Sequence, residues 1–469
     1  MTHHLSAPGT PLSVAARIAE WAAGLDVADV PATVRRAVAN TVIDTAALGI
    51  ASFDTDYGRA VRGMPASAGP CTVFGGTATL DPYAAALING TMAHGEDYDN
   101  TYEGCPVHSG VVIVPALLAA GEAHGLPADR VALGMAVGIE LMCRLGMVAQ
   151  KAVHTAGFHP TSVLGTPAAA AGVAVAMGLD AGRIGDALGV AGSLSSGIIE
   201  YLADGSWTKR LHAGWAAQSG IRAAELGAHG FRGPATVFEG VHGLYKAFAP
   251  GLNPDFDLLL AGLGTHWEAA NVAFKPYACG TMTQPYIDCA VNLRRHGIAP
   301  GDIVDITCAV GEGTVHRLWA PLELKQRPPT PYAAKFSGPF CVAVGVLRGD
   351  AGLSEFTEAT ITDPHVLALA AKVRFEVDPD NPYPRAYTGE LKVTLRDGRT
   401  IIESQPHLRG GVDQPMSRDD LVAKARANLA FGHWHGDAAN LITLAEGMFD
   451  DPRTLSANLL SGTLSSQRE

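Results

Sequence analysis

The sequence has few cysteines, and no pair of them has a metal-binding spacing. None of the seven forms a C-x-x-C motif, so the sequence offers neither an iron–sulfur nor a zinc pattern; they lie at positions 71, 105, 143, 279, 289, 308 and 341. The first five residues lack a basic run followed by an apolar segment, so we expect no secretory signal. Together these absences predict reduced thiols and a cytoplasmic location.

Positive charge is also scarce. The 34 Lys and Arg residues are outnumbered by 46 Asp and Glu, which leaves a formal net charge of −12 on 469 residues. Because nucleic-acid binding needs clustered Lys and Arg, we expect no nucleic-acid partner. With 47% hydrophobic residues the chain can bury a large core, and its length predicts two or three domains.

Long runs of bulky apolar residues are missing. The mean hydropathy of +0.14 is high for a soluble protein, and the uncharged stretch at residues 161–179 has the length of a membrane span. That stretch is mostly Ala, Gly, Val and Thr, with Pro167 inside it, and therefore carries little bulky apolar surface. We predict a buried helix there and no membrane partner.

The first part of the chain predicts a succession of helices. Their apolar positions recur at helical spacing, and the predicted ranges are 11–25, 31–50, 82–94, 110–124, 128–151, 161–178, 181–194 and 213–230. Most are rich in Ala and Gly on nearly all faces, which is typical of helices buried between other helices. Small residues also allow close approach of backbones, so we expect a compact helical domain.

Strand patterns appear after about residue 270. Residues 303–310, 372–377, 390–395 and 399–403 alternate, and Asp397-Gly398 between the last two ranges predicts a hairpin. Helices are predicted at 282–295 and 335–348, and again after Ser417. The predicted fold is mainly α: a large helical domain at 1–268, an inserted α+β domain at 269–412, and C-terminal helices at 413–469 that return to the helical domain.

General enzyme motifs are absent. The chain contains no G-x-x-x-x-G-K-[ST], H-E-x-x-H or G-x-S-x-G, and Gly311-Glu312-Gly313 lacks the third glycine of a dinucleotide-binding turn. Nucleotide hydrolysis, zinc proteolysis and α/β-hydrolase chemistry therefore have no support.

Polar residues in the helical part are the better candidates, because a buried charge is costly unless it is paired or used. The densest group runs from His94 to Thr101 and is followed by His108; a solvated acidic loop with helix caps would explain it equally well. His159 precedes Pro160 and an apolar helix, so it lies near the positive end of that helix, where an anionic substrate group is favoured; a capping histidine without a catalytic role is the alternative. Lys209 and Lys275 taken singly would be surface charges. Together these cations, acids and imidazoles suit a small polycarboxylate.

At these residues the sequence resembles the MmgE/PrpD family, which includes 2-methylcitrate dehydratase, cis-aconitate decarboxylase and iminodisuccinate epimerase. The matching motifs occur in order: Ala93-His94, Asp97-Tyr98-Asp99-Asn100-Thr101, His108, Gly157-Phe158-His159-Pro160, Lys209-Arg210-Leu211-His212-Ala213-Gly214, Phe238-Glu239-Gly240, Phe274-Lys275-Pro276-Tyr277 and Ala334-Lys335-Phe336-Ser337. The resemblance implies a large all-α domain with a smaller α+β lid, arranged as a homodimer, and a site between the two domains.

The resemblance also implies which residues form the site. The positions that match pocket residues of the decarboxylase branch are Asp97, Thr101, His108, His159, Lys209 and Lys275, to which we add His212 and Tyr277. The sequence departs from that branch at Asn100, at Ser109 and at Phe340, which replaces a pocket tyrosine. These departures bear on which acid is the substrate.

Removing a proton next to a carboxylate requires a base and fixed cations nearby. Without a cluster motif, we expect no cofactor and no metal, and a mechanism that depends on Lys and His. We predict His108, His159, Asp97 and Lys209 as catalytic, with Asp97 orienting an imidazole, and Thr101, His212, Lys275 and Tyr277 as substrate-binding. The predicted activity is a lyase for a small di- or tricarboxylic acid, first a dehydratase; a decarboxylase, an epimerase or isomerase, and a non-catalytic scaffold remain alternatives.

Overall fold

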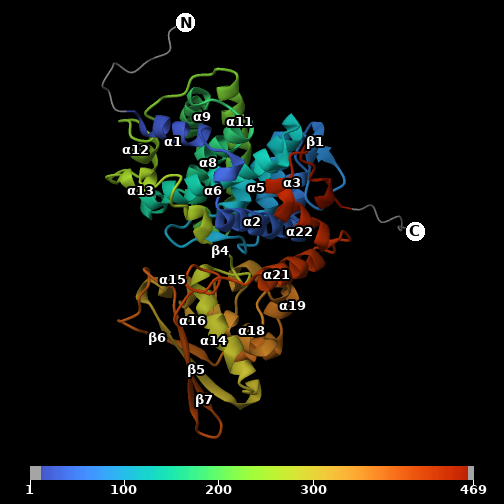
Figure 1. The fold of residues 1–469 in the computed structure, drawn as a ribbon. Helices are drawn as coiled ribbons and strands as arrows, with labels where there is room; N and C mark the ends of the chain where they lie inside the picture. The colour runs from blue at the N-terminus through green and yellow to red at the C-terminus, as the bar shows by residue number, and fades with distance from the viewer. Residues whose placement is uncertain (1–11, 463–469) are drawn as a thin grey trace, which may run out of the picture. The chain divides into compact units, whose positions relative to one another are not determined.

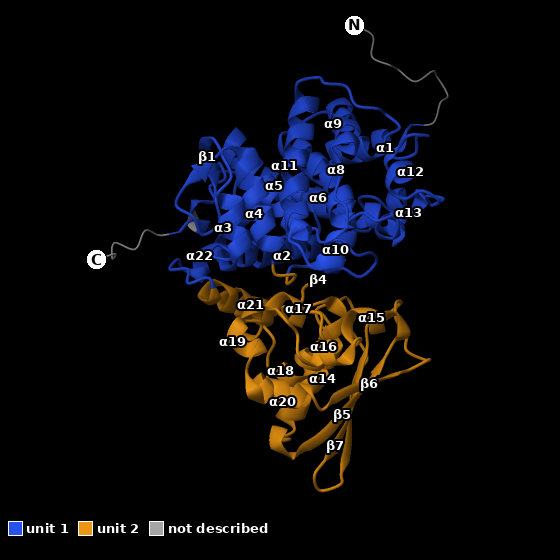
Figure 2. Ribbon diagram, turned by 180° about the vertical axis from the view of Figure 1, so that it is seen from behind, with its two compact units in different colours: residues 1–95, 99–272, 432–469 blue, residues 96–98, 273–431 orange. Residues whose placement is uncertain are grey.

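The computed structural model describes residues 12–462, which form two compact units (Figure 2). Unit 1 comprises Asp99–Val272 together with the described residues before Glu96 and after Phe431. Unit 2 comprises Glu96–Tyr98 and Ala273–Phe431. The expected lack of a secretory signal concerns residues 1–5, and the first predicted helix begins at residue 11; both positions lie outside the described residues.

Unit 1 is built from helices with only short strands (Figure 1). The strands are β1 (Ala68–Thr72), β2 (Thr79–Leu80) and β3 (Thr101–Tyr102), and the first residue of β4 (Val272–Ala273) is the last of this segment of unit 1. The helices are α1 (Val14–Ala23), α2 (Ala32–Ala51), α3 (Asp56–Arg62), α4 (Pro82–His94), α5 (Gly110–His124), α6 (Ala128–Ala149), α7 (Ala152–Thr155), α8 (Pro160–Ala176), α9 (Ala181–Leu194), α10 (Tyr201–Asp204), α11 (Thr208–Ala228), α12 (Leu244–Phe248), α13 (Asp257–Leu260) and α22 (Ala438–Gly447).

The predicted helices of this region are present, and the mainly α class is confirmed. Helices α4, α5 and α9 begin and end at the predicted residues. Helix α11 was predicted from residue 213 but begins at Thr208, because the polar residues before Ala213 carry no apolar periodicity and yet continue the same helix. This earlier start places Lys209 and His212 on a helix rather than in a loop.

Local sequence signals explain where two important helices begin. The Asp81 side chain accepts hydrogen bonds from the backbone N–H groups of Tyr83 and Ala84 at the start of α4, and Pro82 occupies the first turn. Helix α8 begins at Pro160, directly after His159. His159 therefore lies at the N-terminal end of a buried helix, as predicted.

Glycines allow the central helices of unit 1 to touch through their backbones. A Cβ atom on Gly214 of α11 would lie 2.0 Å from the carbonyl oxygen of Leu87 in α4, and one on Gly90 would lie 2.7 Å from Cα of Gly214. Helices α6 and α8 meet in the same way at Gly134 and Gly172. The expectation that small residues permit close helix approach is confirmed, and the α4–α11 contact brings two histidine-bearing helix ends together.

The long apolar helices are buried within unit 1. Every residue of α8 is buried, which confirms the predicted buried helix there. Helix α6 is long and apolar enough to cross a membrane by length and composition, and 94% of its apolar window is buried inside the protein. This burial is what a core helix requires.

Unit 2 combines helices with a four-stranded sheet of order β6-β5-β7-β8 (Figure 1). Strands β5 (Ile303–Val310) and β6 (Val373–Val377) are parallel, whereas β5 with β7 (Gly389–Leu395), and β7 with β8 (Thr400–Gln405), are antiparallel. The predicted hairpin at Asp397-Gly398 joins β7 and β8, with Gly398 at φ 84°. Its helices are α14 (Gln284–Arg295), α15 (Val315–Leu318), α16 (Leu322–Gln326), α17 (Pro331–Ala334), α18 (Gly338–Arg348), α19 (Glu358–Ile361), α20 (Pro364–Ala370) and α21 (Arg418–Phe431).

The core of unit 2 lies between its helices and the sheet. Helix α14 packs against β7, β8 and α18, and the fully buried Trp319 packs edge-on against Tyr286. Unit 2 extends to Phe431 and so includes α21, which the sequence analysis had assigned to the returning C-terminal helices; the chain re-enters unit 1 at Gly432.

Candidate active site

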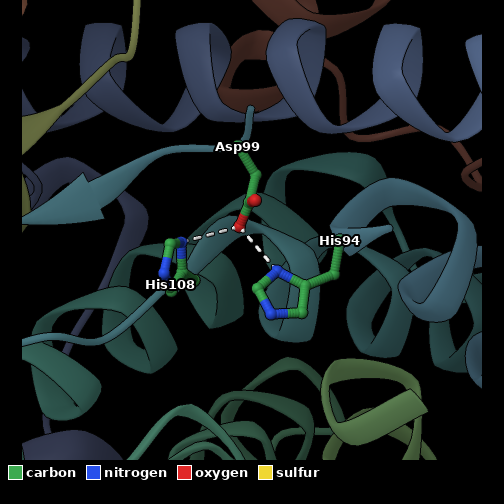
Figure 3. Close-up of side chains that lie close together, drawn as sticks. All are labelled: His94, Asp99 and His108. Atoms are coloured by element: carbon green, nitrogen blue, oxygen red, sulfur yellow. Dashed lines mark hydrogen bonds and ion pairs between the residues drawn. The ribbon is translucent and has the colours of Figure 1, made fainter. Parts of the chain in front are cut away.

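The end of α4 and the loop after it bring two histidines onto one carboxylate. Oδ2 of Asp99 lies 3.1 Å from Nδ1 of His94 and 2.9 Å from Nδ1 of His108 (Figure 3). Nδ1 of His108 also lies 3.0 Å from the carbonyl oxygen of Asn100. Because ionised carboxylate and carbonyl oxygens only accept hydrogen bonds, each Nδ1 carries a proton, and in the neutral rings each Nε2 keeps its lone pair.

Asp99 is charged although it is fully buried. Burial alone would raise its pKa, but the facing rings of His108 and His94 hold the pKa of Asp99 well below its ordinary value. Oδ1 of Asp99 and Nε2 of His94 are buried and have no hydrogen-bond partner among the described residues. A buried polar atom without a protein partner marks a place where a water molecule or a substrate group can bind.

A second histidine pair adjoins the first. Nδ1 of His159 lies 3.1 Å from Nδ1 of His212, so one ring must donate the hydrogen bond and the other must accept it. The His159 ring stacks on that of His94, with centroids 5.7 Å apart and planes 20° apart. The His94 and His108 rings meet edge-on at 4.9 Å. Four imidazoles therefore form one continuous group inside unit 1, which we call the histidine cluster: His94, His108, His159 and His212.

Burial keeps three of these rings in their neutral form. It lowers the pKa of His94 despite the attraction of Asp99, and it lowers the pKa of His159 well below the ordinary value. Burial likewise lowers the pKa of His212 to about 4. The positive charge of Lys209 contributes to all three shifts, so the Lys209 ammonium group acts on the cluster from the first turn of α11. At neutral pH these imidazoles are bases with a cation beside them.

A pocket of about 510 Å³ borders the cluster at His212. It is formed by the loop before α10, by α10 and by the first turns of α11, and its wall includes Glu200, Tyr201 and Trp215. The Tyr201 ring lies edge-on to His212 at 6.0 Å and to His159 at 6.3 Å. His212 is only 7% exposed, so it separates the pocket from the interior of the cluster.

The side chains of His94, Asp99 and His108 could also hold a metal ion. One ligand atom each from His94, Asp99 and His108 lies within 4.8 Å of the others. The carbonyl of Asn100 beside Nδ1 of His108 argues for a protonated nitrogen, which has no lone pair for a metal. We therefore assign these contacts as hydrogen bonds.

The remaining predicted acid and lysine meet in unit 2. Nζ of Lys275 donates to Oδ1 of Asp97 at 2.9 Å and to the Asp97 carbonyl oxygen at 2.7 Å, and both side chains are buried. Asp97 has a left-handed backbone, with φ 54°. The carboxylate that contacts His94 and His108 is Asp99, so the role of Asp97 in orienting an imidazole stays a prediction.

Two predicted substrate-binding residues make internal hydrogen bonds. The Tyr277 hydroxyl donates to Oδ1 of Asp288 at 2.8 Å, and burial raises the pKa of Tyr277. The Thr101 hydroxyl donates to the carbonyl oxygen of Val107 at 3.3 Å, which ties the ends of the loop before His108. Their role in binding stays a prediction, as does the location of the site between the two domains.

Two departures from the decarboxylase branch contact each other. Nδ2 of Asn100 lies 3.4 Å from Oγ of Ser109, and Oδ1 of Asn100 accepts a hydrogen bond from the backbone N–H of Gly110 at 2.9 Å. Both residues flank His108 and are buried. The third departure, Phe340, is fully buried in α18 with its ring 6.1 Å from that of Phe356.

Sequence reasoning placed His94 and Asp99 in the densest polar group but assigned neither a role. Asp97 and Asp99 are two residues apart and chemically identical, so no sequence signal separates them. The usable signal was the position of His94 at the last turn of an apolar helix, where an imidazole is buried with its neighbours.

One mainly helical unit buries four histidines in mutual contact, two of them on the Asp99 carboxylate, and these groups are suited to acid–base catalysis. The MmgE/PrpD N-terminal domain model matches residues 16–257, and the MmgE/PrpD C-terminal domain model matches residues 277–446. The chain belongs to the MmgE/PrpD family, as the sequence motifs predicted.

Three curated relatives of the chain are named cis-aconitate decarboxylase. It is 31% identical over 365 residues to cis-aconitate decarboxylase of Homo sapiens, covering 74% of this chain and 73% of the relative. It is 30% identical over 386 residues to the enzyme of Mus musculus, covering 79% and 76%. It is 26% identical over 461 residues to the enzyme of Aspergillus terreus, covering 91% of both chains. These similarities support an enzyme of the lyase type.

Proposed function

We propose that the protein is a metal-independent decarboxylase of a small unsaturated polycarboxylic acid of the cis-aconitate type. The observation that carries this proposal is the buried histidine cluster, with Asp99 on two of its rings and Lys209 beside it. The relatives named cis-aconitate decarboxylase support the choice of reaction over the dehydration that the sequence alone favoured.

The reaction consumes one proton and releases carbon dioxide. The bond to the departing carboxylate breaks and its electron pair forms a new double bond, while the electron pair of the old double bond takes up the proton at the carbon beside a remaining carboxylate. The cluster can supply that proton: an anionic substrate favours the imidazolium form, so its binding offsets the burial that keeps the rings neutral in the free protein.

The proposed roles follow from the contacts of each group. His108, whose Nδ1–H is held by Asp99, and His159 are the acid–base groups. Lys209 stabilises the negative charge that develops as the bond breaks, and Lys275 with Asp97 contributes to binding the carboxylates. The expected homodimer and the cytoplasmic location stay predictions.

Dehydration of a hydroxy-polycarboxylate is the second candidate, and one observation favours it. The lowered pKa values of His94, His159 and His212 keep these rings unprotonated at neutral pH, so each can accept the proton whose abstraction begins an elimination of water. The altered pair Asn100 and Ser109 beside His108 also fits a substrate different from cis-aconitate.

Mass spectrometry separates the candidates. Purified protein is incubated with a panel of tricarboxylic, hydroxy-dicarboxylic and iminodicarboxylic acids; loss of CO₂ identifies the decarboxylase, loss of water the dehydratase, and altered chirality without a mass change the epimerase. We expect loss of CO₂ from an unsaturated tricarboxylate, retained in EDTA and abolished by Lys209→Ala or His159→Ala. Activity that survives both substitutions would refute the assigned groups, and activity lost in EDTA would refute the metal-free mechanism.

A further inference from the structure

The histidine cluster lies out of contact with water except at its edges. The side chain of His94 is fully buried, and His159 is 4% exposed. A decarboxylase must nevertheless bring one proton per turnover to the reacting carbon, so a route for that proton is needed. This inference therefore rests on the proposed function.

The His159–His212 pair has the geometry of such a route. The two Nδ1 atoms are 3.1 Å apart, which is a hydrogen-bond distance. Each ring has a second nitrogen, Nε2, on its far side, so an imidazole can take a proton on one nitrogen and release one from the other. His212 lines the pocket of about 510 Å³, which is large enough to hold several water molecules.

The pocket itself is poorly suited to the proposed substrate. The charged residues in its wall, Glu200 and Asp204, are both acidic, and no Lys or Arg belongs to the described lining. Polycarboxylates would be repelled there, whereas water and neutral or cationic proton donors would be admitted. His212 thus borders a compartment suited to proton exchange and unsuited to carboxylate binding.

We infer that His212 is a proton relay that passes protons from this pocket to His159. Nε2 of His212 takes a proton from pocket water, the proton on its Nδ1 moves to Nδ1 of His159, and His159 gives the proton on its Nε2 to the substrate carbon as the bond to CO₂ breaks. One proton enters and one CO₂ leaves in each cycle. The transfer leaves the proton of His212 on Nε2 and that of His159 on Nδ1, so each ring turns by about 180° about its Cβ–Cγ bond to restore the starting arrangement before the next turnover. The sequence analysis had instead assigned His212 to carboxylate binding.

The two roles predict different kinetics. A relay acts on the chemical step, so its loss lowers kcat and leaves KM nearly unchanged, whereas loss of a carboxylate ligand raises KM. The variants are His212→Ala, which opens the site to the pocket, and His212→Gln, which keeps most of the side-chain volume. The matched control is His229→Ala, which removes an exposed imidazole that follows the last residue of the same helix, α11.

The test measures CO₂ release by wild type and the three variants, with and without added imidazole. We expect kcat to fall about 100-fold in both His212 variants, KM to change little, and imidazole to restore kcat saturably in His212→Ala. The solvent deuterium isotope effect on kcat should rise in these variants, and His229→Ala should behave as wild type. Circular dichroism confirms that each variant is folded.

Three results would overturn the relay: wild-type kcat in His212→Ala, a raised KM at unchanged kcat, or a lowered kcat in folded protein that neither imidazole nor isotope substitution affects. Wild-type protein in the same experiment keeps the two proposals apart. If it releases CO₂ from no acid, the proposed function fails; if it is active and His212→Ala is unimpaired, only the relay fails.

Discussion

The contact between α4 and α11 leads to a quantitative prediction. Gly214→Ala places a Cβ atom 2.0 Å from the Leu87 carbonyl oxygen, although ordinary van der Waals contact begins at 3.4 Å. The obstacle is backbone, which cannot rotate away as a flexible side chain can. The helices must therefore separate by about 1 Å, and a gap of that size already removes a quarter to a half of the dispersion energy of the atoms involved.

The expected cost combines two opposing terms. Overpacking of a tightly packed site costs up to about 3 kcal/mol, and the fixed backbone puts this substitution at that upper end. Replacing Gly by Ala inside a helix by itself stabilises the folded state by up to about 1 kcal/mol. The free energy of unfolding of unit 1 should therefore fall by about 2 kcal/mol, the difference between these two terms.

The matched control is the same substitution in open space. Gly185 lies inside α9, and the nearest atom to its added Cβ, on Ala19, is 4.0 Å away. Gly185→Ala should therefore raise stability by about 0.5–1 kcal/mol. Urea unfolding followed by circular dichroism measures both variants, and enzyme turnover reports whether moving α11 also displaces His212. Equal stabilisation by the two substitutions would refute the backbone contact, and with it the packing that brings the histidine-bearing helix ends together.

Three further predictions test the buried charges. Asp99→Asn replaces a carboxylate that accepts from two N–H groups with an amide that must present its own N–H to one of them. The free energy of unfolding should fall by about 2–4 kcal/mol and kcat by about 100-fold. A variant with wild-type kcat would refute the role of Asp99 in fixing the tautomers. In the folded protein the pKa of His212 is about 4, and that of His159 is well below its ordinary value of 6.5. The unfolded chain therefore binds more protons than the folded one as pH falls from 6.5 towards 4, and stability is lost in that window. Melting temperatures measured across this window should decline less steeply in His212→Ala than in wild type, and identical slopes would contradict the lowered pKa. Arg144→Met removes the cation that pairs with the buried Glu140 carboxylate and the donor to the carbonyl oxygens of Leu259, Ala261 and His266. The free energy of unfolding should fall by about 3–5 kcal/mol, measured by urea unfolding. A loss below about 1 kcal/mol would mean that the Arg144–Glu140 pair behaves as if exposed to solvent.

The elements of unit 1 were predictable because their signals are local. Helix α4 begins at Pro82, directly after its N-cap Asp81, and α8 begins at Pro160. Because these residues act within one helical turn, the boundaries can be predicted from the local sequence. Asp397-Gly398 does the same for the β7–β8 hairpin. The start of α11 was missed because its first turn is polar, and only packing against α4, α8 and α9 shows that those residues continue the helix.

The sequence by itself determined the class of fold, the family and the set of residue types available for chemistry. Which of them meet was decided by tertiary structure. Asp97 and Asp99 are the same residue type two positions apart, but in the folded chain Asp97 pairs with Lys275, whereas Asp99 contacts His94 and His108. Likewise His159 and His212 are 53 residues apart, and only the packing of α8 against α11 sets their nitrogens 3.1 Å apart. Hydrogen bonds and pKa shifts depend on distance and burial, and neither quantity exists until the helices have packed.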